Sequence, residues 1–331
     1  MKALIIGGTG TISTSICHRL VEQGWDLTVL NRGRSRDRLP AEARLIEADM
    51  SDEKAVAALL QNETFDTVAE FIVYTPEQIE RDIRLFNGRC GQYIFISTAS
   101  AYQKPPASPL IRESTPLYNP YWSYSQAKIA CEDRLVAAYR QTGFPITIVR
   151  PSHTYSDWTL PLAIHGDNGP WQTLKRIMEG RPVVVHGDGH TLWTLTHSDD
   201  FATAFTGLMG NSHAIGESYH ITSDEALTWN HIYRIIGSAL GAEPNIVHIS
   251  TDELVAAKPD LLGPLQGDKA HCALFDNSKI KALVPDFRCS VRFDLGARRV
   301  IETFKANPSL QRDDPEWDDF LDRLIAGRPV V

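Results

Sequence analysis

Short apolar runs alternate with amphipathic segments along the first half of the chain. Residues 3–6 are consecutive apolar residues and predict a strand that is buried on both faces. The apolar side chains of Ile12, Ile16 and Leu20 then recur at every fourth position, which predicts one face of a helix that ends near Gly24. The same unit is repeated further on. The pattern predicts more strands at residues 27–30, 45–48, 67–73, 93–97 and 146–149, and more helices at 53–61, 76–87 and 123–142.

Strands that alternate with crossover helices form a parallel sheet, and right-handed crossovers place helices on both of its faces. The pattern therefore predicts an α/β fold with a doubly wound parallel sheet, the Rossmann arrangement, in residues 1–151. Residues 152–197 are rich in Gly, Pro, Trp and His, and the alternating pattern describes them poorly.

The second half of the chain divides between that sheet and a further lobe. A helix at 199–209 and a strand at 219–222 are expected to return to the sheet, so residues 198–224 are assigned to the first domain. An amphipathic helix is expected at 229–240, followed by short helices and loops. Residues 152–197 and 225–331 are thus expected to form a smaller C-terminal α+β substrate-binding lobe, with a cleft between the two parts.

A glycine-rich turn, Gly7-Gly8-Thr9-Gly10-Thr11-Ile12-Ser13, lies between the first predicted strand and the first predicted helix. A parallel sheet places the tight turn of a dinucleotide site here, because a Cβ atom would block the turn and the close approach of a pyrophosphate. The helix N-terminus adds free backbone N–H groups and a partial positive charge. The turn therefore predicts a bound nucleotide, and a purely structural turn is the alternative.

The segment after the second predicted strand bears on the choice of nicotinamide cofactor. An acidic residue there would bind the ribose hydroxyls and repel a 2′-phosphate. This chain has Asn31-Arg32-Gly33-Arg34-Ser35-Arg36, with three arginines and no carboxylate, which favours NADP and leaves NAD as the alternative. A loop in which Arg34 and Arg36 are merely solvated is also open. After the third strand, Asp49 and Met50 are expected beside the adenine.

Tyr124 and Lys128 stand four residues apart on one face of a predicted helix. A tyrosine has an ordinary pKa of about 10, and a nearby ammonium group lowers it, so the pair can exchange a proton with a substrate hydroxyl. The helix follows the strand that ends near Thr98, whose hydroxyl is expected at the carboxyl edge of the sheet, where the cofactor lies. These three residues are the predicted catalytic set.

Together these motifs resemble the extended and atypical branch of the short-chain dehydrogenase/reductase superfamily, the NAD-dependent epimerase/dehydratase family. Gly7, Gly10 and Ser13 match its Gly-x-x-Gly-x-x-Gly, with Ser13 in place of the third glycine. The other matching segments are Asp49 with Asp52, residues 97–102, residues 150–155, and residues 187–189 with Asp199 and Asp200. The resemblance extends from residue 1 to about residue 240.

The resemblance implies an oxidoreductase or epimerase that uses hydride transfer. Tyr124 would exchange the hydroxyl proton, Lys128 would hold the cofactor ribose, and Thr98 would orient the substrate oxygen. Dehydration ranks lowest, because the acid and base that it needs would stand at Ala99 and Ser100. A homodimer through the helices after the fourth and fifth strands is also implied. The implied cofactor-binding residues are Gly7, Thr9, Gly10, Thr11, Ile12, Asn31, Arg32, Arg36, Asp49, Met50, Lys128 and Pro151.

Departures from the family pattern concern the substrate. Glu70 begins the segment Glu-Phe-Ile-Val where the family has His-Leu-Ala-Ala, and His153 replaces an asparagine. Trp193 stands where nucleotide-sugar enzymes have an arginine for the diphosphate; an indole can stack on a ring but cannot pair with phosphate. We therefore expect a sugar or sugar-like small molecule, bound by Ser100, His153 and Trp193. Similar departures occur in a subgroup that includes chloroplast stem-loop-binding proteins, so a non-catalytic or RNA-binding member is the alternative.

Composition excludes several classes of partner. The 331 residues include 33 Lys and Arg and 41 Asp and Glu, a formal net charge of −8, so neither nucleic acid nor an anionic membrane surface is expected as a partner. No apolar stretch approaches the roughly 18 residues of a membrane span, and a cytoplasmic location is expected. The five cysteines have no metal-ligand spacing, and neither do His186, His190 and His197, so no metal is expected.

Overall fold

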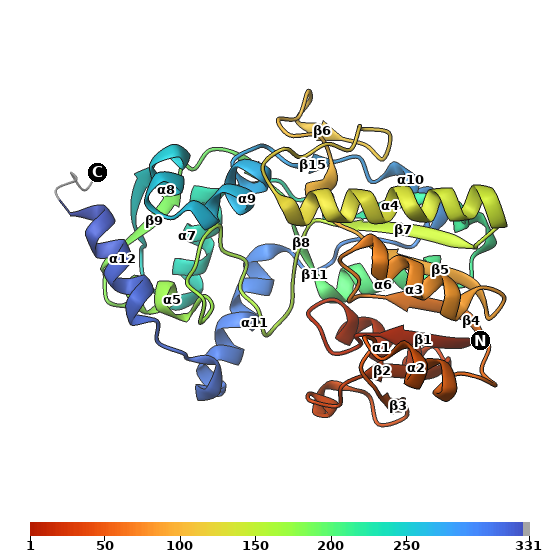
Figure 1. Cartoon of the computed structure of the whole chain (residues 1–331). Coiled ribbons are helices and arrows are strands. Elements are labelled where there is room, and N and C mark those ends of the chain that lie inside the picture. Colours follow the sequence, from red (N-terminus) through yellow and green to blue (C-terminus); the bar gives the residue numbers. More distant parts are fainter. Residues whose placement is uncertain (327–331) are drawn as a thin grey trace.

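The computed structural model describes residues 1–326, which form two parts that lie side by side (Figure 1). The larger part contains a seven-stranded sheet in the order β12-β7-β5-β4-β1-β2-β3, and all neighbouring strands are parallel. The order reverses between β1 and β4, which is the switch point of a doubly wound sheet. The predicted α/β fold is therefore confirmed. The strands are β1 (Lys2–Ile6), β2 (Asp26–Asn31), β3 (Arg44–Glu47), β4 (Phe65–Glu70), β5 (Cys90–Ile96), β7 (Ile146–Pro151) and β12 (Ser218–Ile221).

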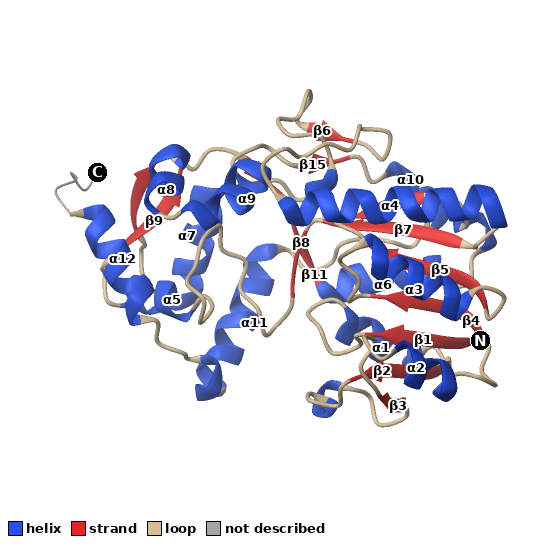
Figure 2. Ribbon diagram, in the orientation of Figure 1, coloured by secondary structure: helices blue, strands red, loops and turns tan. Residues whose placement is uncertain are grey.

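Helices cover both faces of this sheet (Figure 2). The apolar run of β1 serves both faces: Ala3 and Ile5 belong to one core, and Leu4 and Ile6 belong to the other. This division follows from the alternation of side chains along a strand. The first core is covered by α1 (Ser13–Glu22), α6 (Ser198–Leu208) and α10 (Ser278–Leu283), and the second by α2 (Glu53–Leu59), α3 (Pro76–Phe86) and α4 (Ser123–Thr142).

The fourth strand of the sheet is shorter than its apolar sequence predicts. β4 ends at Glu70, three residues before the predicted end at Val73. The Glu70 carboxyl accepts a hydrogen bond of 2.6 Å from the Ile72 N–H, which turns the chain away from the sheet. The apolar residues that follow the strand therefore form a loop beside the glycine turn instead of a continuation of the strand.

Residues 152–197 contain one helix and four short strands, although the alternating pattern describes this stretch poorly. The short strands in this region pair with segments far away in the sequence or with each other, so local periodicity does not reveal them. β8 and β11 pair side by side and carry the chain out of the sheet and back to α6 (Figure 1). The elements are β8 (His153–Tyr155), α5 (Trp171–Met178), β9 (Pro182–His186), β10 (Leu192–Trp193) and β11 (Leu195–His197).

The smaller part has its own apolar cores, in which Trp193 and Trp229 are among the largest buried side chains. Its C-terminal helices are longer than predicted, since α11 has 14 residues and α12 has 11. Two short strands, β6 (Leu110–Ile111) and β15 (Leu274–Phe275), pair beside the sheet. The remaining elements are β13 (Leu227–Thr228), α7 (Trp229–Leu240), β14 (Asn245–Ile249), α8 (Thr251–Ala257), α9 (Leu262–Pro264), α11 (Phe293–Ala306) and α12 (Pro315–Ile325).

Within residues 1–326, no helix has both the length and the apolar character needed to cross a membrane. The same residues contain no group of three or more His, Cys, Asp or Glu side chains arranged to hold a metal ion.

Candidate functional site

The glycine turn joins β1 to α1 at the carboxyl edge of the sheet. Gly7 has a φ of +82°, and a Cβ atom there would lie 2.6 Å from Cγ2 of Ile72, so only glycine fits without displacing the loop after β4. The Ser13 hydroxyl accepts a hydrogen bond of 2.9 Å from the Gly10 N–H and donates one of 2.7 Å to the Gly7 carbonyl. Ser13, in the position of the third glycine, therefore closes the turn with its side chain.

The turn and the start of α1 fit the pyrophosphate of a dinucleotide. Gly10 is exposed, and Thr11 and Ile12 are partly exposed. Among the described residues, none accepts a hydrogen bond from the backbone N–H of Thr11 or Ile12. Free N–H groups at the positive end of a helix are suitable ligands for phosphate oxygens.

Asn31 ends β2 at the position expected for the adenosine ribose. Its Oδ1 accepts a hydrogen bond of 2.8 Å from the Gly33 N–H, whereas its Nδ2 is buried and has no partner among the described residues. A buried amide donor of this kind suits a hydroxyl or phosphate oxygen of a ligand. Arg32, Arg34 and Arg36 are exposed beside it, and within the described residues they form no ion pair.

Asp49 and Met50 follow the neighbouring strand β3 at the same edge of the sheet. Hydrogen bonds from Ser51 are the main cause that lowers the pKa of Asp49, and the nearby Arg32 and Arg34 charges contribute. Met50 is buried, and its carbonyl oxygen is held by the guanidinium of a residue in α3. These two positions thus border the groove where the adenine is expected.

Thr98, Ser100, Tyr124, Pro151 and His153 line one pocket of about 290 Å³. Thr98 and Ser100 share a hydroxyl–hydroxyl hydrogen bond of 2.9 Å, and the Thr98 oxygen also accepts from the Ser100 N–H at 3.2 Å. These bonds fix the Thr98 side chain at the end of β5. The structure therefore brings together five of the residues that the sequence singles out, from three separate segments.

Lys128 lies behind this pocket rather than in its lining. Its Nζ donates hydrogen bonds of 2.6 Å to the Val73 carbonyl and 2.7 Å to the Ile96 carbonyl, so it bridges the loop after β4 and the end of β5. The same Nζ lies 4.8 Å from the ring centroid of Tyr74. Burial lowers the pKa of Lys128 to about 8.

The acidity of Tyr124 differs from the expectation. Burial raises the pKa of Tyr124 to about 12, although the Thr98 hydroxyl acts in the opposite direction. Lys128 does not offset the burial, because its Nζ is directed to two carbonyl groups and lies 6.0 Å from the centroid of the Tyr124 ring. The expectation that Lys128 depresses this pKa is therefore wrong for this structure. At neutral pH Tyr124 carries its proton and can donate it.

His153 and Trp193 interact with each other. Trp193 is only 1 % exposed and is not among the described residues that line the pocket; it packs against Trp229 with ring centroids 5.4 Å apart. Its Nε1–H donates a hydrogen bond of 3.2 Å to Nδ1 of His153. This bond assigns the proton of the neutral imidazole to Nε2, and burial holds the pKa of His153 well below its usual range. The structure thus places Trp193 where it orients His153, not where it can stack on a ligand in this pocket.

Asp268 and Lys269 also line the pocket, and the sequence does not single them out. They end a π-helical turn, Leu265–Lys269, beyond the part of the chain that resembles a family. Trp122, which precedes α4, completes this wall of the pocket. The only sequence signal nearby is the close spacing of Gly263 and Gly267.

A buried carboxyl pair lies behind the loop after β4. Glu70 and Asp82 are both 0 % exposed. Burial and the charge of Asp82 raise the pKa of Glu70 well above its usual range. Asp82 accepts hydrogen bonds of 2.7 Å from the Tyr93 hydroxyl and 2.8 Å from Nε of Arg81. Burial also raises the pKa of Asp82, but the Arg81 charge and these hydrogen bonds oppose that shift, so Glu70 is the carboxyl that holds a proton more readily.

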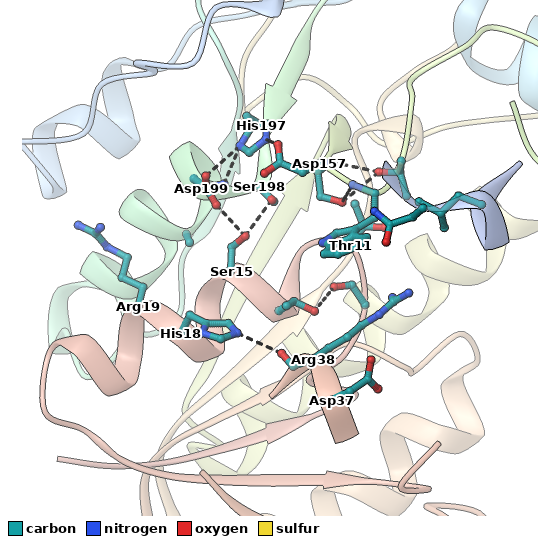
Figure 3. Close-up of a pocket in the computed structure, with 18 of the residues that line it drawn as sticks. Thr11, Ser15, His18, Arg19, Asp37, Arg38, Asp157, His197, Ser198 and Asp199 are labelled. Atoms are coloured by element: carbon teal, nitrogen blue, oxygen red, sulfur yellow. Dashed lines mark hydrogen bonds and ion pairs between the residues drawn. The ribbon is translucent and has the colours of Figure 1, made fainter. Parts of the chain in front are cut away.

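A larger cavity, of about 760 Å³, opens beside the glycine turn between α1, α6 and residues 156–159 (Figure 3). In its wall His197 contacts Asp157 at 3.1 Å and accepts a hydrogen bond of 3.2 Å from the Asp199 N–H. Carboxylates and basic side chains both line this cavity, including Asp37 and Arg38. The larger cavity favours neither charge and does not contain Tyr124, so the smaller pocket is the candidate substrate site.

The fold and these residues define a class of dinucleotide-binding enzymes with a hydroxyl-lined site at the carboxyl edge of the sheet. Residues 3–222 match the NAD dependent epimerase/dehydratase family, and the match covers more than half of the chain. The chain therefore belongs to this family, as its motifs predict, and the prediction of an NAD-dependent enzyme of the epimerase/dehydratase type is confirmed.

Individual relatives carry names that describe different activities. A 2′-dehydrokanamycin reductase of Streptomyces kanamyceticus is 26% identical over 76% of this chain and 70% of its own length. A chloroplast stem-loop binding protein of Arabidopsis thaliana is 29% identical over 76% of this chain and 67% of its own length. A dTDP-glucose 4,6-dehydratase of Bacillus anthracis, solved in complex with NAD, shares the fold with a TM-score of 0.75, at 16% identity over 97% of this chain and 99% of that chain.

Proposed function

We propose that this chain is an NAD(P)-dependent oxidoreductase that acts on a hydroxyl or carbonyl group of a sugar or sugar-like small molecule. The observation that carries the proposal is the convergence of the Thr98 and Tyr124 hydroxyls on one pocket, with Lys128 fixed behind it. This pocket opens at the sheet edge that holds the glycine turn. Net reduction and a transient oxidation within an epimerisation both use this set of groups.

Tyr124 is the group that moves the proton at the substrate oxygen. Because its pKa is about 12, the phenol is protonated at neutral pH and donates to a carbonyl oxygen as that oxygen becomes a hydroxyl. Thr98, held by its hydrogen bond to Ser100, orients the same oxygen. The nicotinamide cofactor supplies or accepts the hydride when it is bound. Lys128 supports this arrangement from behind, because its ammonium group donates to the Val73 and Ile96 carbonyls and holds the backbone there.

NADP is the cofactor that the adenosine end of the groove favours. The buried donor of Asn31 suits a 2′-phosphate, and so do the exposed Arg32 and Arg36, which form no ion pair within residues 1–326. The Arg32 charge contributes to the lowered pKa of Asp49, so the Asp49 carboxylate balances part of the positive charge of the arginines, and NAD is the alternative. The ratio of the dissociation constants of NADPH and NADH tests this preference: a lower constant for NADPH supports it, and a lower constant for NADH refutes it.

The relatives support a redox function and also supply a second candidate. The Streptomyces kanamyceticus relative is named for a reduction, which agrees with a protonated Tyr124. The similarity to the chloroplast stem-loop binding protein supports RNA binding without catalysis. RNA binding depends on a basic surface, whereas this chain has a net charge of −8. Redox chemistry is therefore the better supported of the two.

Turnover of the cofactor tests the proposal. The purified chain is incubated with oxidised or reduced NAD and NADP and a panel of keto sugars and polyols, free and UDP-linked, while nicotinamide fluorescence is followed. We expect at least one member to react, and Tyr124→Phe to lower the rate by about 10²- to 10⁴-fold. Tyr118→Phe, at an exposed tyrosine, is the matched control and should leave the rate unchanged. A rate that survives Tyr124→Phe refutes the mechanism, and a panel without any reaction refutes the enzymatic function.

A further inference from the structure

We infer that Asp268 and Lys269 are the substrate-recognition residues of the Tyr124 pocket, and that the substrate is an uncharged, hydroxylated single ring without a diphosphate. The inference rests on the proposed function and names the substrate class of the same site. It begins from the π-helical turn Leu265–Lys269, which places a carboxylate and an ammonium group in the lining. π-Helical turns are rare and are frequent at functional sites.

Both charged side chains belong to the reacting end of the pocket. Asp268 and Lys269 line it together with Thr98, Tyr124 and His153. The Asp268 carboxylate is close enough to Tyr124 to contribute to the raised pKa of the phenol. Its Oδ2 lies 3.5 Å from Nζ of Lys269, and both side chains are less than one-fifth exposed. A ligand that reaches Tyr124 therefore meets this pair.

Hydrogen bonds hold the turn in place independently of its charged side chains. The Lys269 carbonyl accepts a hydrogen bond of 3.2 Å from the Trp229 Nε1–H. The Asn119 amide donates to the Gly267 carbonyl at 2.7 Å and to the Ser100 carbonyl at 2.8 Å, so one side chain ties the turn to the segment that carries Thr98. The carboxylate and ammonium are thus presented by a fixed backbone.

Close packing explains the two glycines near the turn. A Cβ atom at Gly263 would lie 2.3 Å from Cδ1 of Trp122, and one at Gly267 would lie 3.0 Å from its Cβ. The turn therefore lies directly against Trp122, which also lines the pocket. This packing closes the wall and leaves the side chains of Asp268 and Lys269 as its polar surface.

The charges and size of the pocket decide the class of ligand. Asp268 and Lys269 balance each other, and none of the described residues that line the pocket is an arginine. A diphosphate would meet the Asp268 carboxylate without a guanidinium to pair with. An uncharged ring can donate hydroxyl protons to Asp268 and accept hydrogen bonds from Lys269 and from Nε2 of His153. A volume of about 290 Å³ is at the lower end for small-molecule sites and suits a single ring.

Two uncharged rings and one diphosphate serve as probes with the oxidised cofactor bound. Methyl α-D-glucoside and myo-inositol are compared with UDP-glucose at equal concentrations, and both the reduced nicotinamide and any epimer that forms are measured. We expect an uncharged ring to react and UDP-glucose to give no reaction. Reaction of UDP-glucose with neither uncharged ring reacting would overturn the inference while the proposed function stands. If none of the three reacts, the assigned substrate class is wrong.

Variants at the turn separate recognition from folding. Asp268→Ala should raise the KM for the reacting ring by about 10- to 100-fold, because a hydrogen bond to a charged group is lost, and should leave the dissociation constant of the cofactor unchanged. Asp268→Asn keeps an acceptor oxygen and should give a smaller increase. Asp260→Asn, at an exposed carboxylate just before the turn, is the control. An unchanged KM in Asp268→Ala would rule out recognition by this residue.

Discussion

Replacing the buried Glu70 by glutamine should remove one contribution to the pH dependence of the free energy of unfolding. Glu70 is completely buried, and burial together with the Asp82 charge raises its pKa well above its usual range. The folded chain therefore binds one more proton here than the unfolded chain does. Stability must then fall as pH rises from the ordinary range of a glutamate towards the raised pKa. Glutamine keeps the oxygen that accepts the Ile72 N–H and has no proton to lose.

The size of the effect follows from proton linkage. Within that pH range, one extra bound proton lowers the free energy of unfolding by about 1.4 kcal/mol for each pH unit. Between pH 5.5 and pH 7.5 the Glu70→Gln variant should therefore gain stability relative to the parent chain, up to about 3 kcal/mol when the folded-state pKa lies above this range. Arg81 and the Tyr93 hydroxyl favour the charged form of Asp82 in both proteins, and burial acts against it.

Urea unfolding of both chains at the two pH values measures this difference. Glu42→Gln removes an exposed carboxyl and controls for the loss of one surface charge. The free energy of unfolding of this control should follow that of the parent chain at both pH values. If the free energy of unfolding of Glu70→Gln changes with pH as that of the parent chain does, Glu70 is ionised in the folded state, and the reasoning is refuted.

Three further substitutions test other parts of the structure. Ser13→Ala removes the hydroxyl whose 2.7 and 2.9 Å hydrogen bonds close the glycine turn, and should weaken cofactor binding by about 10-fold in a fluorescence titration; an unchanged affinity would refute this role. The affinity for the cofactor should fall as pH rises through about 8, the pKa of Lys128. The Lys128→Met variant should bind the cofactor weakly and with an affinity that does not change with pH in this range. If the variant keeps the pH dependence, another group causes it. Arg176→Met deletes a side chain that is 1 % exposed and pairs with two carboxylates of α12 at 2.7 and 2.8 Å; it should cost about 2 kcal/mol in urea unfolding, and a loss below 0.5 kcal/mol would contradict the structural role of these pairs.

The sheet and the cofactor turn could be predicted because their signals are local. The apolar run of β1 and the glycines after it are adjacent in the sequence, and α4 begins and ends at the predicted residues, Ser123 and Thr142. The predicted end of β4 was wrong because a side chain, Glu70, turns the chain within an apolar run. Local pattern carries no information on such a bond.

The substrate side of the pocket could not be predicted in the same way. β9 and β14 lie about 60 residues apart in the sequence and become regular only when they pair, so periodicity within either segment is weak. Asp268 and Lys269 reach Tyr124 because a distant turn is tied down by Asn119. Trp193 was expected in the pocket from its place in a motif, yet its large ring fills the core of the second part. Burial of this kind depends on the whole fold.

Titration of the purified chain with NADPH and with NADH, followed by nicotinamide fluorescence, tests the central claim most directly. A dinucleotide is expected on the Ser13-closed turn, with its nicotinamide beside Tyr124 and Lys128. We therefore predict saturable binding of a reduced cofactor to the parent chain, with an affinity that falls in Ser13→Ala. Failure of both NADPH and NADH to bind the folded parent chain would contradict the account.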